Sequence, residues 1–256
     1  MLTILLLVHR TAPLALLLSV LPALAQPSTA LTDVLAQARF SRMEPGDVVA
    51  PWRTVGLPAQ KVPRTRFDIQ SMNGESVLRI QADASYGNLV LDAYRTQLPP
   101  QAQLRWRWQL ARGLPASDLQ RKEGDDAPVK VCALFDMPLD GMPFGEQARL
   151  RLARTLSGEP LPSATLCYVW DRLLPQGRIL ANVFSPRVRY LVVSAGPAQP
   201  GTWQTIERPL AQDFILAFGQ ESPVVPPLVA LVVGADADNT AGSSLAWVGD
   251  LRLEMP

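Results

Sequence analysis

The segment Leu104–Leu110, with the sequence LRWRWQL, alternates apolar and polar residues without a break. Successive side chains of a β-strand point to opposite faces, so this alternation predicts a strand with one buried and one polar face. Trp106 and Trp108 share the apolar face, and Arg105 and Arg107 share the polar one. We therefore expect the tryptophans in a core between two sheets and the arginines on an outer face.

Similar runs, rich in β-branched and aromatic residues, recur along the chain between clusters of Pro, Gly, Asn and Asp. They are Ser76–Ala82, Gly87–Ala93, Val129–Phe135, Ala164–Trp170, Arg187–Ser194, Thr202–Glu207, Leu228–Val233 and Ser244–Glu254. Prolines fall between the runs. This placement favours strands within the runs, because proline cannot donate a hydrogen bond within a central ladder. The pattern predicts an all-β, antiparallel β-sandwich of the jelly-roll type, concanavalin-like or galactose-binding-like.

Two segments predict short helical insertions into the sandwich. Gly145–Leu156 carries apolar residues at fourfold spacing, and Ala211–Phe218 ends at Gly219, a residue typical of helix ends. A lead-in over residues 26–46 contains apolar residues at the spacing of a short amphipathic helix. We expect residues 47–256 to form a single domain, since no repeat or linker divides them.

The first 25 residues predict a secretory signal peptide. Arg10 precedes the apolar run Thr11–Leu24, and the triplet Ala23–Ala25 matches the small-x-small cleavage pattern. The run is short for a membrane span of about 20 residues. We therefore expect a periplasmic or secreted protein without a transmembrane span after cleavage; an uncleaved anchor is the alternative.

Composition excludes several classes of function. Hydrophobic residues make up 48% of the 256 residues and charged residues 18%, which is too apolar for a disordered chain. The net charge of +1 creates no strong field for binding nucleic acid. The single histidine, His9, lies in the predicted signal, so the mature chain excludes Ser-His-Asp catalysis and His-ligated zinc. We expect no nucleic-acid partner and favour a role without catalysis.

Two cysteines, Cys132 and Cys167, lie in two of the predicted strands. An exported compartment permits a disulfide between them. The alternative is a pair of buried thiols that act as small apolar side chains. We favour the thiols, because two cysteines define no disulfide framework.

Charged side chains on outer strand faces are the candidates for ligand binding. Lys130 and Asp136 share one face of a predicted strand, Asp171 ends another, and Asp125 and Asp126 precede Lys130. Arg and Lys donate hydrogen bonds and carboxylates accept them, so a face that carries both can hold a polar ligand. The candidate ligand-binding residues are Arg105, Arg107, Asp125, Asp126, Lys130, Asp136 and Asp171.

The segment Asp236–Gly242 resembles the start of a calcium loop. The EF-hand pattern requires a glutamate where this chain has Trp247, so an EF-hand is excluded. A different Ca²⁺ loop would take its oxygens from Asp236, Asp238 and Asn239, and an ordinary polar turn is the alternative. We expect no other cofactor.

The order of several motifs resembles the bacterial exported family called domain of unknown function 3047. The motifs are Leu104–Trp108, Lys122–Asp126, Leu166–Trp170, Val193–Gly196, Glu207–Arg208, Asp213–Phe214, Ala217–Gly219, Asp236–Thr240 and Gly249–Leu251. The resemblance covers nearly the whole mature chain and implies a secreted or periplasmic β-sandwich. It implies no particular activity.

Three functions remain open. The first is a non-catalytic binding module for a carbohydrate or another polar envelope ligand, favoured by the polar outer face and the missing histidine. The second is a polysaccharide-active enzyme that uses two of the carboxylates, which would have to lie about 5–5.5 Å or about 6.5–9.5 Å apart. The third is a structural or assembly protein of the envelope. The sequence leaves the ligand and the oligomeric state open.

Overall fold

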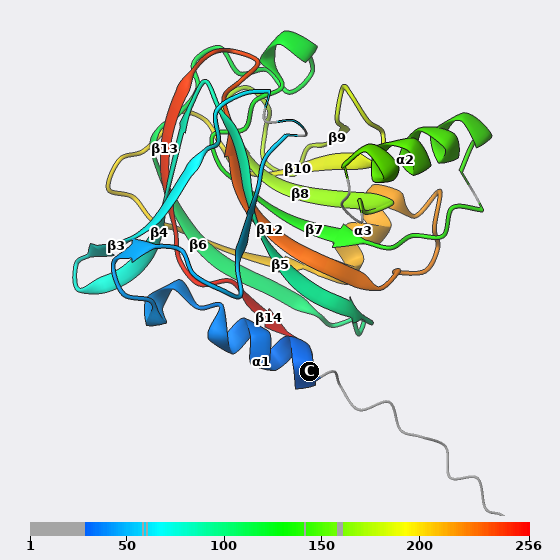
Figure 1. The fold of residues 1–256 in the computed structure, drawn as a ribbon, viewed down its shortest axis with the longest axis horizontal. Helices are drawn as coiled ribbons and strands as arrows, with labels where there is room; N and C mark the ends of the chain where they lie inside the picture. Colours follow the sequence, from blue (N-terminus) through cyan, green and yellow to red (C-terminus); the bar gives the residue numbers. More distant parts are fainter. Residues whose placement is uncertain (1–28, 58, 60, 141, 158–160) are drawn as a thin grey trace, which may run out of the picture.

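The structure is a computed structural model that describes residues 29–57, 59, 61–140, 142–157 and 161–256. These residues form two seven-stranded sheets that pack face to face (Figure 1). This arrangement confirms the predicted all-β sandwich of the jelly-roll type. The predicted signal peptide, residues 1–25, lies outside the described residues. Among the helices of the described part, none is both long and apolar enough to cross a membrane.

The first sheet, sheet A, is antiparallel throughout. Its order is β1 (Gly46–Asp47), β3 (Arg66–Met72), β4 (Glu75–Asp83), β13 (Ser243–Val248), β6 (Gln103–Arg112) and β11 (Gln204–Pro209), and β14 (Arg252–Glu254) also pairs with β6. Asn73 and Gly74 join β3 to β4 with φ angles of 54° and 82°. These angles fit a type I′ turn, which suits the twist of a tight hairpin.

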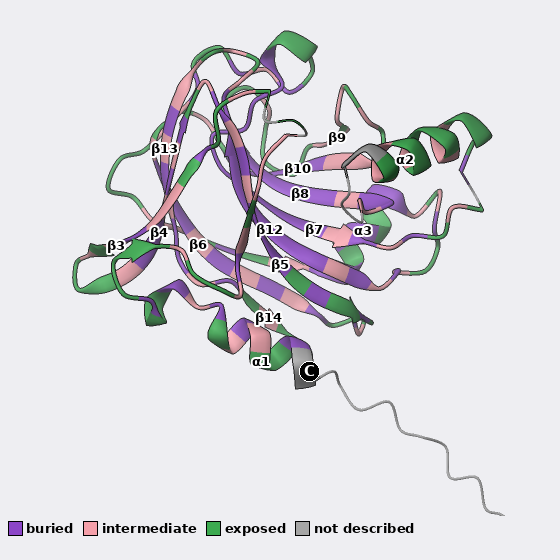
Figure 2. Ribbon diagram, in the orientation of Figure 1, coloured by how far each residue is buried: buried purple, intermediate pink, exposed green. Residues whose placement is uncertain are grey.

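The second sheet, sheet B, contains the longest apolar runs. Its order is β2 (Arg53–Val55), β5 (Tyr86–Thr96), β12 (Leu228–Asp236), β7 (Lys130–Phe135), β8 (Ala164–Asp171), β10 (Val188–Ala195) and β9 (Ile179–Ala181). Strands β8 and β10 are parallel, and the other pairs are antiparallel. Strands β7, β8 and β12 are buried along nearly their whole length (Figure 2), as near-continuous apolar runs predict.

The helices match the predicted insertions. Helix α2 spans Phe144–Ser157, α3 spans Leu210–Phe218, and α1, in the lead-in, spans Thr29–Gln37. Helix α3 packs on the core, since the rings of Phe214 and Phe135 lie 4.7 Å apart. Two single-turn 3-10 helices, η1 (Phe40–Arg42) and η3 (Lys122–Gly124), precede β1 and β7 in the chain.

Sequence reasoning missed strands β1, β2, β3 and β9. Three of them have only two or three residues, too few for a pattern, and β3 alternates weakly. The predicted strand Ser244–Glu254 divides into β13 and β14, with Gly249 and Asp250 between them.

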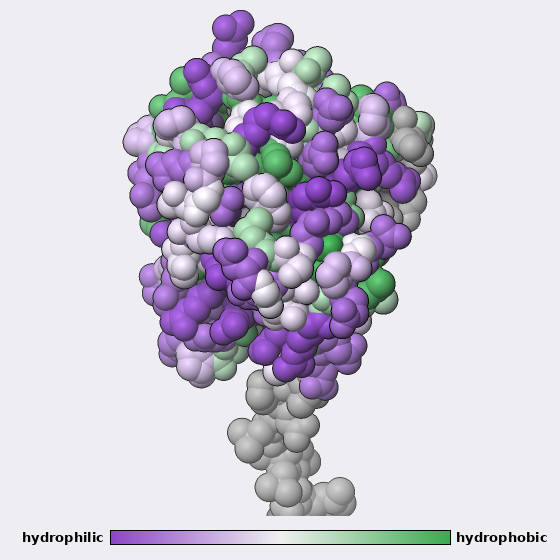
Figure 3. All heavy atoms as spheres, turned by 90° about the vertical axis from the view of Figure 1, so that its left-hand side faces the viewer, coloured by the Kyte–Doolittle hydropathy of each residue, from purple (hydrophilic) through white to green (hydrophobic). Residues whose placement is uncertain are grey.

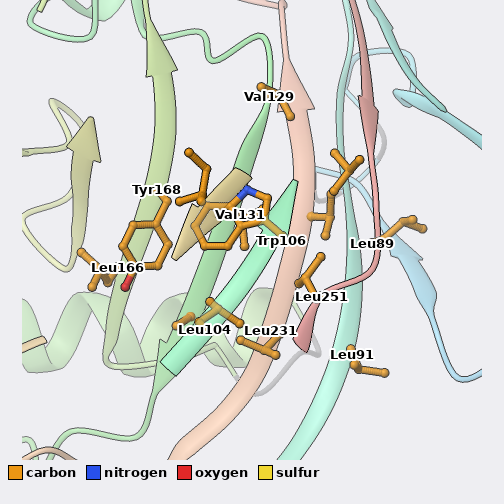
Figure 4. Close-up of a cluster of buried hydrophobic side chains, with 14 of the residues drawn as sticks. Leu89, Leu91, Leu104, Trp106, Val129, Val131, Leu166, Tyr168, Leu231 and Leu251 are labelled. Carbon is orange, nitrogen blue, oxygen red and sulfur yellow. The ribbon is translucent and has the colours of Figure 1, made fainter. Parts of the chain in front are cut away.

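The core between the sheets holds the aromatic residues predicted from alternation (Figure 4). The rings of Trp106 and Tyr168 lie 5.2 Å apart, and those of Trp108 and Trp170 lie 6.3 Å apart. Trp108 Nε1 donates to Ser194 Oγ at 2.9 Å, which satisfies a polar group that would otherwise be costly to bury. The inner-face prediction for these strands is confirmed.

Cys132 and Cys167 form a disulfide, so our preference for free thiols is wrong. Strands β7 and β8 pair in a register that places the two cysteines directly opposite each other, with their Cα atoms 4.0 Å apart. Strand register depends on contacts distant in the sequence, and cysteine spacing alone did not reveal it.

We predict that replacing both cysteines with alanine lowers the free energy of unfolding by about 2–4 kcal/mol, because the bond restricts the unfolded chain. Urea unfolding of wild type, both single variants and the double variant measures this effect. Each single variant should lose as much as the double, since either one breaks the bond. Additive losses, or thiols that can be alkylated in the native protein, would contradict the assignment.

Candidate functional site

The outer face of sheet B, which points away from the core, carries an apolar cluster. Its members, the outer cluster, are Val90, Leu119, Ala127, Cys132, Cys167, Val169, Tyr190, Val192, Ala230 and Val232. Leu119 and Ala127 come from the loop that precedes β7, and Val55, Leu174 and Leu180 pack against the cluster from other segments. Segments beside the sheet therefore cover part of this face, and they bring polar side chains with them.

A buried ion pair lies beside the outer cluster. Lys130 begins β7 and Asp236 ends the neighbouring β12; Lys130 Nζ lies 2.8 Å from Asp236 Oδ2, and both side chains are 8% exposed. Lys130 Nζ also lies 4.9 Å from the ring centre of Tyr86. Burial alone would lower the pKa of Lys130, but the charge of Asp236 and its hydrogen bond, together with Tyr86 and Asp125, outweigh burial, so the pKa is raised. Lys130 therefore stays protonated.

Glycine at position 234 makes room for this arrangement. Gly234 lies between Asn88 and Lys130 in the strand register. A Cβ atom at this position would lie 2.2 Å from Asn88 Oδ1 and 2.8 Å from the carbonyl oxygen of Gly87. A larger residue would therefore displace Asn88, whose Nδ2 donates to the Tyr86 hydroxyl at 3.0 Å.

Asp125 is the most perturbed carboxyl of the site. Its Oδ1 accepts from the Tyr190 hydroxyl at 3.1 Å, and its Oδ2 accepts from Asn182 Nδ2 at 2.5 Å. Burial raises the pKa of Asp125 to about 6, although the Asn182 hydrogen bond opposes this shift. A carboxyl with this pKa changes charge near neutral pH and can accept or donate a hydrogen bond to a ligand.

The Asp126 carboxylate anchors the loop that carries Asp125 to the turn after β12. Its carboxylate accepts from the backbone N–H of Asn239 at 3.1 Å, and from the backbone N–H and hydroxyl of Thr240 at 2.7 and 2.6 Å. Asn239 Nδ2 donates in turn to the Asp125 carbonyl oxygen at 3.0 Å. These contacts join the predicted Asp125–Asp126 motif to the turn after β12, more than a hundred residues away.

The residues of the predicted calcium loop take part in the same network. Asp236 Oδ1 accepts from the Ala127 N–H at 2.6 Å, and its other oxygen holds Lys130. Asp238 is partly buried, and burial raises the pKa of its carboxyl. Among the residues that the structure describes, no group of three or more His, Cys, Asp or Glu side chains is placed to hold a metal ion. The calcium loop stays a prediction.

Arg105 and Arg107 lie on the outer face of sheet A, on the opposite side of the sandwich from Lys130. Arg105 pairs with Glu207 at 2.6 Å and Glu254 at 2.9 Å. Arg107 pairs with Glu75 at 2.5 Å. The side of the molecule where sheet A lies is largely hydrophilic (Figure 3). The candidate ligand-binding residues therefore do not share one face, because alternation within a strand does not tell which sheet the strand joins.

Asp136 and Asp171 have contacts different from those of Asp125. Asp136 follows the far end of β7 and pairs with Arg95. Asp171 Oδ1 accepts from the backbone N–H groups of Leu173 and Leu174, so it caps a turn. The carboxylates of Asp125, Asp136 and Asp171, which the enzyme hypothesis would use, therefore each make different local contacts.

Asn182, Tyr190, Tyr86 and Asn88 complete the site, and sequence reasoning missed all four. Tyr190 lies on the outer face of β10 by alternation, a signal that was available. No local pattern marks Asn182, which reaches Asp125 only because the chain between β9 and β10 folds back.

We predict that the wild-type protein loses stability relative to Asp125→Asn as the pH rises from 3.8 through about 6. The native state holds the Asp125 proton more tightly than the unfolded chain, so deprotonation penalises the native state. Thermal or urea unfolding of both proteins across this range measures the difference. A difference that stays constant with pH would refute the assignment.

Solved structures similar to this chain are β-sandwich proteins of low sequence identity. One is from a study of carbohydrate-binding modules of the β-sandwich superfamily: identity 12%, TM-score 0.37, covering 80% of this chain and 58% of that chain. Another is Trichoderma harzianum endoglucanase 3 of family GH12: identity 8%, TM-score 0.42, covering 82% and 100%. A third is the family 11 carbohydrate-binding module from Clostridium thermocellum: identity 9%, TM-score 0.36, covering 80% and 89%.

The chain spans less than two thirds of the first of these structures. No curated protein matches the chain. The family model described as protein of unknown function (DUF3047) matches residues 50–252, in agreement with the motif order. The chain therefore belongs to the DUF3047 family.

Proposed function

We propose that this protein is a binding module for a carbohydrate, and that the ligand binds on the outer face of sheet B beside Asp125. One observation carries the proposal: the Asp125, Asn182 and Tyr190 hydrogen bonds and the Lys130–Asp236 pair gather outside the core, next to an apolar cluster. Ligand sites commonly combine an apolar surface with a few convergent polar groups. Sugar rings need both, because they carry apolar C–H faces and hydroxyl edges.

An exposed aromatic ring lies close to this network. Phe184 is 60% exposed, and its backbone N–H donates to Asn182 Oδ1 at 2.9 Å. The turn that carries the ring is thus tied to the Asp125 network. Lys122 Nζ, on the loop before β7, lies 5.8 Å from the ring centre. Phe184 offers a flat apolar surface with the Lys122 ammonium group nearby as a donor, and this combination suits stacking of a sugar ring.

A second candidate function rests on the pKa of Asp125. A carboxyl with a pKa of about 6 suits a general acid near neutral pH. Glycoside hydrolysis normally needs a second carboxylate, and Asp236 is already engaged by Lys130 and Ala127. We therefore place binding first and make product formation a measured outcome below.

We predict that isothermal titration of the full chain detects binding of a neutral oligosaccharide from the malto-, cello-, manno- or xylo- series. Phe184→Ala should weaken the affinity at least tenfold, about 1.4 kcal/mol. Arg105→Ala, on the outer face of sheet A, is the matched control and should leave the affinity unchanged. The same samples are analysed chromatographically for shortened products, which would favour the enzyme.

Two outcomes would reject this site. If no oligosaccharide of the panel binds, the carbohydrate proposal fails. If Arg105→Ala weakens binding and Phe184→Ala does not, the ligand lies on sheet A instead.

We also propose that the protein is exported. The signal pattern of residues 1–25 supports this, and so does the Cys132–Cys167 disulfide, because such bonds persist mainly in oxidising compartments. Expression of the full chain in a bacterium, followed by mass spectrometry of the periplasmic fraction, should find a chain that begins at Gln26. An intact chain that stays in the cytosol would contradict export.

A further inference from the structure

A pocket of about 400 Å³ lies at the opposite end of β7 from Lys130. Arg95 from β5 and Asp136, directly after β7, form an ion pair at this pocket. Most of the other lining is apolar and includes Met137, Leu139, Val225 and Pro227. By alternation along β7, Asp136 lies on the same outer face of sheet B as Lys130.

A bulge in β5 lies at this pocket and carries Arg95. Leu228 of β12 pairs with Thr96 and Ala230 pairs with Asp92, so three residues of β5 stand opposite Val229 alone. Two of these three, Tyr94 and Arg95, have φ angles of 51° and 56°. Left-handed backbone is unfavourable for residues with a Cβ atom, and two in succession within a strand are unusual. Bulges commonly redirect a side chain, and this one brings Arg95 to Asp136.

The charges of the pair select the chemistry of a ligand. Arg95 and Asp136 are 63% and 32% exposed, so hydrogen-bonding atoms of both remain accessible. Asp136 would repel an anion and Arg95 would repel a cation. Adjacent hydroxyl groups of a neutral sugar can accept from the guanidinium and donate to the carboxylate at the same time. The apolar walls can pack against the C–H face of the same ring.

The two ends of β7 are the right distance apart for one extended ligand. Lys130 and Asp136 are six residues apart, about 20 Å at about 3.3 Å per residue. Between them on the outer face lie Cys132, which is buried under the covering segments, and Leu134, which is half-buried. A linear ligand that reaches both ends would therefore lie over Leu134 near Asp136 and over the segments that cover Cys132 near Lys130.

We infer that the Arg95–Asp136 pocket is a second subsite for neutral sugar residues of a linear oligosaccharide whose other end lies beside Asp125. This inference rests on the proposed carbohydrate function. It adds that the ligand is uncharged at this end and long enough to reach both ends of β7.

The test compares disaccharides and hexasaccharides of the malto-, cello-, manno- and xylo- series by isothermal titration with the full chain. The double variant Arg95→Gln/Asp136→Asn keeps polar side chains at both positions and removes the charges. It should weaken hexasaccharide binding at least tenfold and leave disaccharide binding unchanged. Phe184→Ala should weaken both.

Val224→Trp provides a second variant in case the double variant does not fold. Val224 lines the pocket and is 69% exposed, so a larger side chain can fill the pocket without disturbing the core. This variant should also weaken only the hexasaccharide. Thermal unfolding of each variant confirms that it is folded.

The outcomes separate the two proposals. If Phe184→Ala weakens hexasaccharide binding but the pocket variants do not, the second subsite is wrong and the proposed function stands. If no sugar binds the wild type, both fail. Two charged hexasaccharides, an anionic one of uronic acid and a cationic one of glucosamine, are also titrated. If either binds the wild type more tightly than the neutral hexasaccharides do, the assignment of a neutral ligand is wrong.

Discussion

Sheet B is apolar on both of its faces, and much of the remaining structure follows from this constraint. The inner face packs against sheet A, but the outer cluster also needs cover, since each large apolar side chain left in water would forgo about 1.5–3 kcal/mol. Segments before β7 and around β9 supply this cover through Leu119, Leu174 and Leu180. Such loops must then satisfy their own backbone groups, because unpaired buried N–H and C=O groups are costly.

Buried carboxylates provide those hydrogen bonds. Asp126 accepts from the turn at Asn239 and Thr240, Asp236 accepts from Ala127, and Asp171 caps the turn after β8. Lys130 neutralises Asp236, which matters because an isolated buried charge is far less stable than a pair. These contacts explain why a sandwich with a hydrophobic core also buries several charged side chains beneath its surface loops.

Asp125 differs from these carboxylates. Its partners are side chains, Asn182 and Tyr190, and its pKa is displaced to about 6. Perturbed carboxyls of this kind cluster at functional sites, although structural networks also produce them. At the other end of the same face, the bulge of β5 holds Arg95 in a left-handed backbone conformation. Both features lie on sheet B. The polar face of sheet A carries surface ion pairs instead, and each such pair contributes little to the stability of the fold.

Local periodicity was enough to predict the fold class, the long strands and the inner face of Trp106, Trp108 and Tyr168, because alternation within a strand depends only on neighbouring residues. The helices α2 and α3 were predicted for the same reason. The sequence also grouped Asp125, Asp126 and Lys130, which are close along the chain.

Only the tertiary structure decided which strands are neighbours. The strand order pairs Cys132 with Cys167 and places Arg105 and Lys130 in opposite sheets. It also brings Asp236, Asn182 and Tyr190 close to the loop that carries Asp125. Strand order and register arise from burial of whole faces against distant segments, and no short stretch of sequence contains that information.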